Sequence, residues 1–183
     1  DDGLQHQALA RDFEIVVVDG TRGLGNGRLL PAGPLREPAT RLASVDAVVV
    51  NGIGFERPGA IDMRIVPRSV IEVGGTVRRE LSDFAGRPVI AVAAIGHPAR
   101  FFALLREQGL EIEERPFPDH AVVTPGMAGV GQGRAVLMTE KDAVKCTGRG
   151  WQDAWYLTVD AEIEPASAAM LLDRIAALPT ARE

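Results

Sequence analysis

Continuous apolar runs, separated by polar or amphipathic segments, set the pattern of this chain. We expect strands at 15–19, 47–52, 89–96, 111–115, 135–139 and 155–159. Most of these runs are apolar throughout rather than alternating, which is typical of strands buried on both faces of a parallel sheet. Because helical segments separate several of them, the pattern predicts an α/β fold with mainly parallel strands.

Two amphipathic segments have clear helix signals. The segment 98–108 begins with Pro98, which suits a first helical turn, and is followed by Gly109, which suits a C-terminal cap. Phe101, Leu104 and Leu105 recur at helical spacing and predict its buried face. A closing helix is expected over 165–178.

The pattern also suggests how the chain is divided. Prolines 58 and 67 interrupt it, so we place a hinge near that segment and expect domains at 1–53, 54–160 and 161–183. The last segment would pack back on the first. A long Gly- and Pro-rich loop, 20–38, separates the first two strands, and loops of that length are more often functional than idle.

Composition narrows the function classes. The 183 residues are 46% hydrophobic and carry a net charge of −5, so no overall basic field favours nucleic-acid binding. The single cysteine, Cys146, excludes a disulfide within the chain. No apolar run approaches the about 18 residues that span a bilayer.

The first candidate site is the acid pair at the start of the sequence. Adjacent carboxylates such as Asp1 and Asp2 can hold Mg²⁺ against phosphate oxygens. Adjacent aspartates also serve as helix caps or solvated turns. Taken alone, the pair favours the cap or turn interpretation.

The loop 20–38 offers a second candidate. Its glycines allow close backbone approach to a ligand and its arginines could clamp phosphates, unless the loop only packs on the surface. The spacing Gly-x-Gly-x-Gly differs from the dinucleotide-binding fingerprint, and the segment continues into prolines rather than a helix. These residues are Gly23, Gly25, Gly27, Arg22, Arg28 and Arg36.

Two further motifs follow predicted strands. Asp119-His120 places an acid beside an imidazole that can exchange protons near neutral pH, although a loop histidine often has only backbone partners. In Thr139-Glu140-Lys141-Asp142, Thr139 could cap a helix in a capping-box-like arrangement, and Lys141 could reach a phosphate or pair with an acid. Neither lysine of the chain follows a glycine, so the sequence contains no Gly-x-x-x-x-Gly-Lys-[Ser/Thr] loop.

Taken in order, these motifs resemble the tetraacyldisaccharide 4′-kinases of Gram-negative bacteria, over essentially the whole chain. The matching segments are 1–6, 25–38, 95–102, 117–120 and 139–145. The resemblance is to the later part of that family, after its phosphate-binding loop. It implies α/β/α sandwich lobes of a P-loop-kinase type, ATP and Mg²⁺ as cofactors, and a lipid A disaccharide precursor as acceptor.

The resemblance also implies site residues. Asp1 and Asp2 would bind the metal, with Asp2 close to the chemistry, while His120, with Asp119, would assist a catalytic carboxylate that lies upstream of this sequence. Arg36, Glu37, Arg22 and His6 would lie on the nucleotide side. The family also implies peripheral contact with the cytoplasmic face of the inner membrane.

Some positions depart from the family pattern. Leu24 replaces a usual aromatic, and Ala121 replaces a second histidine. With the phosphate-binding loop expected upstream of Asp1, we expect this polypeptide alone to be inactive and prone to self-association. The alternative is a non-catalytic α/β module that binds a nucleotide or a partner chain.

Overall fold

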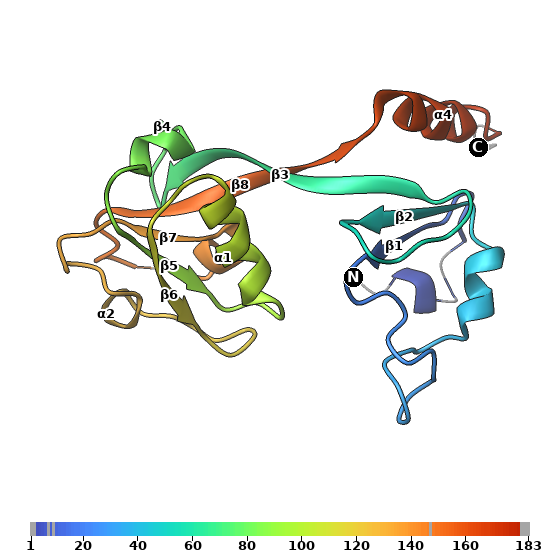
Figure 1. The fold of residues 1–183 in the computed structure, drawn as a ribbon, viewed down its shortest axis with the longest axis horizontal. Helices are drawn as coiled ribbons and strands as arrows, with labels where there is room; N and C mark the ends of the chain where they lie inside the picture. The colour runs from blue at the N-terminus through green and yellow to red at the C-terminus, as the bar shows by residue number, and fades with distance from the viewer. Residues whose placement is uncertain (1–2, 7, 9, 147, 180–183) are drawn as a thin grey trace. The chain divides into compact units, whose positions relative to one another are not determined.

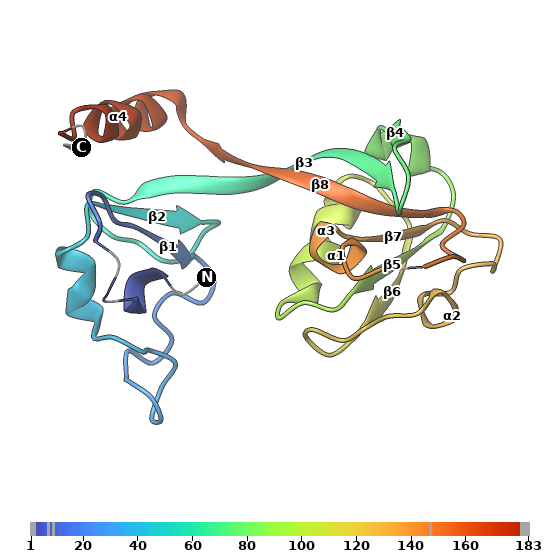
Figure 2. The ribbon, with the colours of Figure 1, turned by 180° about the vertical axis from the view of Figure 1, so that it is seen from behind.

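The computed structural model describes residues 3–6, 8, 10–146 and 148–179. The chain divides into two compact units, Asp1–Ile65 with Ala161–Glu183 (unit 1) and Val66–Asp160 (unit 2). Strands β3 (Ile61–Glu72) and β8 (Ala154–Ile163) each contribute residues to both units. Figures 1 and 2 show the elements of each unit from opposite sides.

Unit 1 is built on a parallel arrangement of β1 (Ile15–Asp19), β2 (Ala47–Asn51) and the start of β3. Val17 pairs with Val49, and Val49 with Ile61. One face of this sheet packs on Leu171 of helix α4 (Pro165–Ala176). The other face packs on Leu42 of the 3-10 helix η2 (Ala39–Ala43). A shorter 3-10 helix, η1 (Gly3–Gln5), precedes β1.

In unit 2 the strand order is β3, β8, β7, β5, β6, with β7 (Val136–Thr139), β5 (Val89–Ala93) and β6 (Ile112–Pro116). The short strand β4 (Arg78–Arg79) pairs with β3 antiparallel, and the 3-10 helix η3 (Leu81–Phe84) follows it. The pairs β5–β6, β5–β7 and β7–β8 are all parallel.

The core of unit 2 has two layers because successive strand residues face opposite sides of the sheet. Ala91 and Leu137 pack on one face with Phe102 and Leu105 of α1 (Pro98–Glu107). Val92 and Met138 pack on the other face, where α2 (Pro125–Ala128) and α3 (Glu140–Ala143) lie. Figure 1 shows α1 on the near face of this sheet, and α3 comes to the front in Figure 2.

The segment 58–67, where the sequence predicted an interruption, is largely a strand. β3 runs without a break for 12 residues and includes Pro67. Its pairing with β2 involves only residues 61–63. Pro67 lies beyond this pairing, so its missing backbone N–H breaks no hydrogen bond to β2. Among the described residues, no helix is long and apolar enough to cross a membrane.

Candidate functional site

In unit 2, the acid–imidazole pair lies in a tight turn just after β6. His120 adopts a left-handed backbone conformation with φ 63°, which is uncommon outside glycine. Its backbone N–H donates to the carbonyl of Ala94, at 3.2 Å, and to Asp119 Oδ1, at 3.0 Å. The His120 Nε2 atom lies 3.8 Å from Asp119 Oδ2, and the ring is 72% exposed. The turn therefore presents an accessible imidazole beside a carboxylate.

Two neighbouring strand ends complete this site. Lys141, on α3 after β7, places Nζ 3.8 Å from Asp119 Oδ1. Gly96, after β5, passes so close that a Cβ there would lie 3.4 Å from Asp119 Oδ2. Because β5, β6 and β7 are parallel, their carboxyl ends meet at one edge, where open α/β sheets bind ligands.

The helix α3 is held as the sequence predicted. Thr139 caps it by accepting from the backbone N–H of Asp142 at 3.2 Å. The Asp142 carboxylate then accepts from the backbone N–H of Ala94 at 2.9 Å, which joins α3 to the end of β5. From the sequence, Asp142 was expected only as part of a helix cap. The one available signal was an acid in a capping box beside a buried strand.

In unit 1, the ends of β1 and β2 approach backbone to backbone. A Cβ on Gly20 would lie 2.8 Å from the carbonyl carbon of Gly52, so no larger residue fits there. Asp19 Oδ1 accepts from the backbone N–H groups of Thr21 and Arg22, which builds the turn into the loop 20–38. Asn51 Oδ1 is buried at this edge without a hydrogen-bond partner in the structure. The loop then projects from the sheet, light blue in Figure 1.

A network of charges fixes the segment before β1. Glu37 accepts from Gln5 Nε2 at 3.1 Å and pairs with Arg41 Nε at 3.3 Å. Arg41 in turn binds Glu14 at 2.7 Å, and this hydrogen bond lowers the pKa of the Glu14 carboxyl below its usual value. Arg11 donates to the carbonyl of His6 at 2.7 Å. The segment that follows Asp1 and Asp2 is thus held at Gln5 by Glu37 and at His6 by Arg11.

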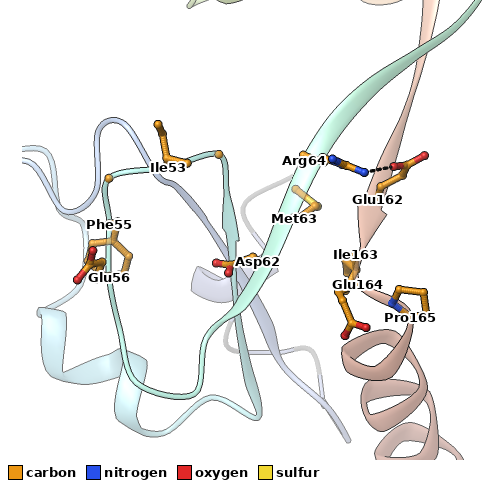
Figure 3. Close-up of a pocket in the computed structure, with 12 residues that line it drawn as sticks. Ile53, Phe55, Glu56, Asp62, Met63, Arg64, Glu162, Ile163, Glu164 and Pro165 are labelled. Carbon is orange, nitrogen blue, oxygen red and sulfur yellow. Dashed lines mark hydrogen bonds and ion pairs between the residues drawn. The ribbon is translucent and has the colours of Figure 1, made fainter.

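A separate open pocket of about 880 Å³ lies within unit 1. Figure 3 shows its lining from the loop after β2, the start of β3 and the junction of β8 with α4. Arg64 and Glu162 pair across it at 3.1 Å, and Glu164 caps α4 by accepting from the N–H of Ser167. None of the predicted site residues lines this pocket.

A family model described as tetraacyldisaccharide-1-P 4′-kinase (LpxK) matches residues 1–176. The chain belongs to this family. It is 48% identical over 179 residues to the tetraacyldisaccharide 4′-kinase of Methylobacillus flagellatus, covering 97% of the chain and 53% of that protein. It is 49% identical over 170 residues to that of Pseudomonas aeruginosa strain LESB58, covering 92% and 51%. The chain therefore spans about half the length of the curated relatives it matches.

The fold is also similar to a solved LpxK structure, that of the Aquifex aeolicus protein in complex with ATP. The TM-score is 0.68 with 26% sequence identity, over 95% of this chain and 56% of that one. The predicted family and the predicted α/β class with mainly parallel strands are both confirmed. The predicted domain bounds are not tested and stay a prediction.

The structure separates the predicted LpxK site residues by unit. Asp119 and His120 lie together in unit 2. In unit 1, Gln5, next to His6 in the sequence, is hydrogen-bonded to Glu37. Arg36 precedes Glu37 and is exposed, and Arg22 lies on the loop after β1. Asp1 and Asp2 lie outside the described residues. Within the described part of the chain, no group of three acidic, histidine or cysteine side chains could hold a metal ion.

Proposed function

We propose that this chain takes part in transferring the γ-phosphoryl group of ATP to the 4′-hydroxyl of a tetraacyldisaccharide 1-phosphate, a lipid A precursor. The observation that carries the proposal is the family match over residues 1–176. In support, the curated relatives have the name of this kinase, and the A. aeolicus LpxK structure is a complex with ATP.

The transfer needs alignment and charge neutralisation more than a covalent partner. The 4′-oxygen attacks the γ-phosphorus, the bond to the ADP oxygen breaks, and the hydroxyl proton passes to a base. By the family resemblance, that base is a carboxylate expected upstream of this sequence. An exposed imidazole 3.8 Å from a carboxylate suits proton handling, and this supports the proposal that His120, with Asp119, assists the upstream base. Lys141, beside the same carboxylate, adds positive charge at this edge.

The nucleotide side is proposed to lie in unit 1. The guanidinium groups of Arg36 and Arg22 are exposed and suit phosphate oxygens, with His6 nearby in the sequence to the acid pair. Glu37 already binds Gln5 and Arg41, so its part is to hold the segment that follows Asp1 and Asp2. Those two carboxylates are of the donor type that Mg²⁺ prefers. Bound Mg²⁺ would neutralise charge on the phosphates.

The proposed location is the cytoplasmic face of the inner membrane of a Gram-negative bacterium, with peripheral contact. The acyl chains of the proposed acceptor support it, because such a substrate resides in a lipid surface. Fractionation of the native organism with an antibody to the chain tests it. Recovery in the washed inner-membrane fraction is expected, and recovery only in the soluble fraction would contradict it.

A chimera tests the activity. In the P. aeruginosa relative, the 170 aligned residues are replaced by the matching part of this chain, and transfer of ³²P from ATP to tetraacyldisaccharide 1-phosphate is measured. We expect a phosphorylated product from the chimera and none from the 183-residue chain alone. A folded chimera without activity would favour a non-catalytic nucleotide- or partner-binding module, which ATP titration of the chain would then examine.

The site assignment has its own matched pair. Replacing His120→Ala in an active chimera should lower kcat by about 10²- to 10⁴-fold, the usual contribution of an acid–base group. His97→Ala is the control, because His97 is also exposed and its side chain makes no capping hydrogen bond. A His120→Ala variant as active as the unsubstituted chimera would remove His120 from the site.

A further inference from the structure

Asp142 is a charged residue in an environment that usually excludes charge. It is 3% exposed and, with Ser69, is one of two buried polar residues in the part of the chain that the structure describes. Burying a carboxylate is unfavourable unless hydrogen bonds and a counter-charge compensate. Thr139 Oγ1 donates to Oδ2 at 2.7 Å, and Lys145 Nζ donates to Oδ1 at 3.0 Å. A side chain so completely bound has a fixed position.

The cap of α3 alone does not require this arrangement. The cap is the bond from the Asp142 backbone N–H to Thr139 Oγ1, and any residue at 142 except proline provides that N–H. The carboxylate makes a different contact, with the backbone N–H of Ala94, 48 residues away in the sequence. It thus joins α3, which directly follows β7, to the end of the adjacent strand β5.

Ala94 passes this constraint to the imidazole-bearing turn. Its side chain is fully buried, its N–H binds Asp142, and its carbonyl accepts from the backbone N–H of His120 at 3.2 Å. The neighbouring Ala93 carbonyl accepts from Phe117 N at 2.8 Å at the start of the same turn. A left-handed residue such as His120 persists only where its surroundings fix it. Two hydrogen bonds in series therefore connect Asp142 to His120.

We propose that Asp142 is a positioning residue for the Asp119–His120 pair, and that it acts through the backbone of Ala94. The same contact fixes α3, the helix that carries Lys141 beside Asp119. The positioning itself follows from the contacts of unit 2, and only its consequence for catalysis rests on the proposed function.

Nuclear magnetic resonance of the unsubstituted chain tests the connection directly. Couplings across hydrogen bonds are expected between Ala94 ¹⁵N and the Asp142 carboxyl carbon, and between His120 ¹⁵N and the Ala94 carbonyl carbon. This measurement needs no variant, so it does not depend on how well a variant folds. Absence of either coupling, with ordinary strand couplings present in β5, would overturn the proposal.

The substitution Asp142→Asn then tests the direction of the effect. An amide keeps the size of the side chain, but it places an N–H₂ group against either Lys145 or the groups that donate to Oδ2. We expect the His120 ring and amide signals to shift and its amide to exchange at least about tenfold faster, as for a weakened local hydrogen bond. His6, in unit 1, should stay unchanged.

Glu140→Gln is the matched control, because Glu140 lies on the same short helix with its side chain exposed. It removes the same charge without touching Ala94. If it moves the His120 signals as much as Asp142→Asn does, net charge rather than positioning is responsible and the proposal fails. If Asp142→Asn leaves the His120 signals in place, the proposal also fails.

Kinetics separate positioning from mere stability. In an active chimera, Asp142→Asn should lower kcat by about 10- to 100-fold, as small misplacements do, with KM values for ATP and acceptor nearly unchanged. Glu140→Gln should leave both unchanged. An inactive chimera would count against the proposed function only, since the resonance measurements stand alone. Unchanged kcat in a variant with shifted His120 signals would refute the catalytic consequence.

Discussion

The two units stabilise their parallel strands in different ways. In unit 2 all five residues of β5 are fully buried, because helices cover both faces of the sheet. In unit 1, β2 is buried from Ala47 to Val50, and its last residue, Asn51, is half-buried. On β1, Val18 is 6% exposed while Ile15 and Val17 are 44% and 58% exposed. The edge strand of unit 1 therefore leaves one apolar row uncovered within the described structure.

This difference extends to the candidate site residues. Those of unit 2 rest on buried strand ends and a buried carboxylate. In unit 1, the segment near His6 is held by the partly exposed ion pairs of Arg11, Glu14, Glu37 and Arg41. Packing supports the first group and charge supports the second. Screened ion pairs near a surface contribute little each, so we expect the unit 1 site to be the more easily disturbed.

The largest effect is expected from opening the unit 2 core. Phe84 is fully buried and packs edge-on against Trp155 at 5.6 Å between ring centroids. Phe84→Ala should lower the free energy of unfolding by about 3–5 kcal/mol, because apolar burial is lost and a cavity remains. Thiol labelling of Cys146 reports the opening, because burial raises the pKa of that thiol to about 11 and keeps it unreactive in the folded unit.

The matched variant is Leu42→Ala in unit 1, where Leu42 packs under the sheet. Leu42→Ala should lower the free energy of unfolding of unit 1 by about 2–5 kcal/mol by the same mechanism. If the two units unfold separately, the rate of Cys146 labelling should stay unchanged. Equal acceleration of labelling in both variants would show that the units unfold as one, and the comparison would then not hold.

A smaller effect is expected from pH, and at β1 it should arise from the neighbouring Glu14 carboxyl. The hydrogen bond from Arg41 holds the pKa of Glu14 below its usual 4.5. Because the folded pKa is the lower one, this contribution to stability is present above pH 4.5 and is lost as the pH falls through the folded value. Hydrogen exchange should therefore show β1 losing protection on acidification below pH 4.5.

Glu14→Gln should remove this pH dependence from β1 while leaving exchange in β5 as before. Glu113 offers a parallel control in unit 2, since hydrogen bonds from Arg115 and Arg134 lower its pKa in the same way. If Glu113→Gln changes β1 exchange as much as Glu14→Gln does, the acid sensitivity is not local to unit 1.

Local patterns in the sequence were enough to predict β5, β7 and α1, because their signals lie within the segments themselves. The Thr139 cap was predictable for the same reason, because its signal also lies within one short segment. β3 was not predicted, since polar residues such as Asp62, Arg64 and Arg68 alternate along it and Pro67 interrupts its apolar character. Its pairing with β8 explains these residues, because Arg64 and Arg68 bind Glu162 and Asp160.

The candidate site was predictable only in part for a related reason. The residue types at 119 and 120 indicate proton chemistry, but their mutual geometry depends on a left-handed backbone at His120. The contact of Asp142 with Ala94 depends on which strands become neighbours. No spacing within the sequence carries that information, because the two residues meet only once β5 and β7 have paired.

The smallest change in folding stability is expected at the uncovered row of β1. Val17 shares its face with Val49, yet it is 58% exposed. Val17→Lys should therefore alter the free energy of unfolding by no more than about 0.5 kcal/mol, as is usual for surface positions. Its main expected effect is weaker self-association, measured by sedimentation velocity over a range of concentrations, because a lysine on an edge strand opposes strand pairing.

The change in net charge cannot explain weaker self-association of Val17→Lys, so the test is specific for the position of the lysine. Adding one lysine changes the net charge from −5 to −4, which reduces repulsion between chains and would by itself favour association. Val144→Lys makes the same change at a position of unit 2 that is 75% exposed. If both variants associate as the unsubstituted chain does, the row on β1 is not the contact surface. If only Val17→Lys becomes monomeric, the uncovered row on β1 of unit 1 is the self-association surface. The sheet of unit 2 offers no equivalent surface, because its own helices cover both faces.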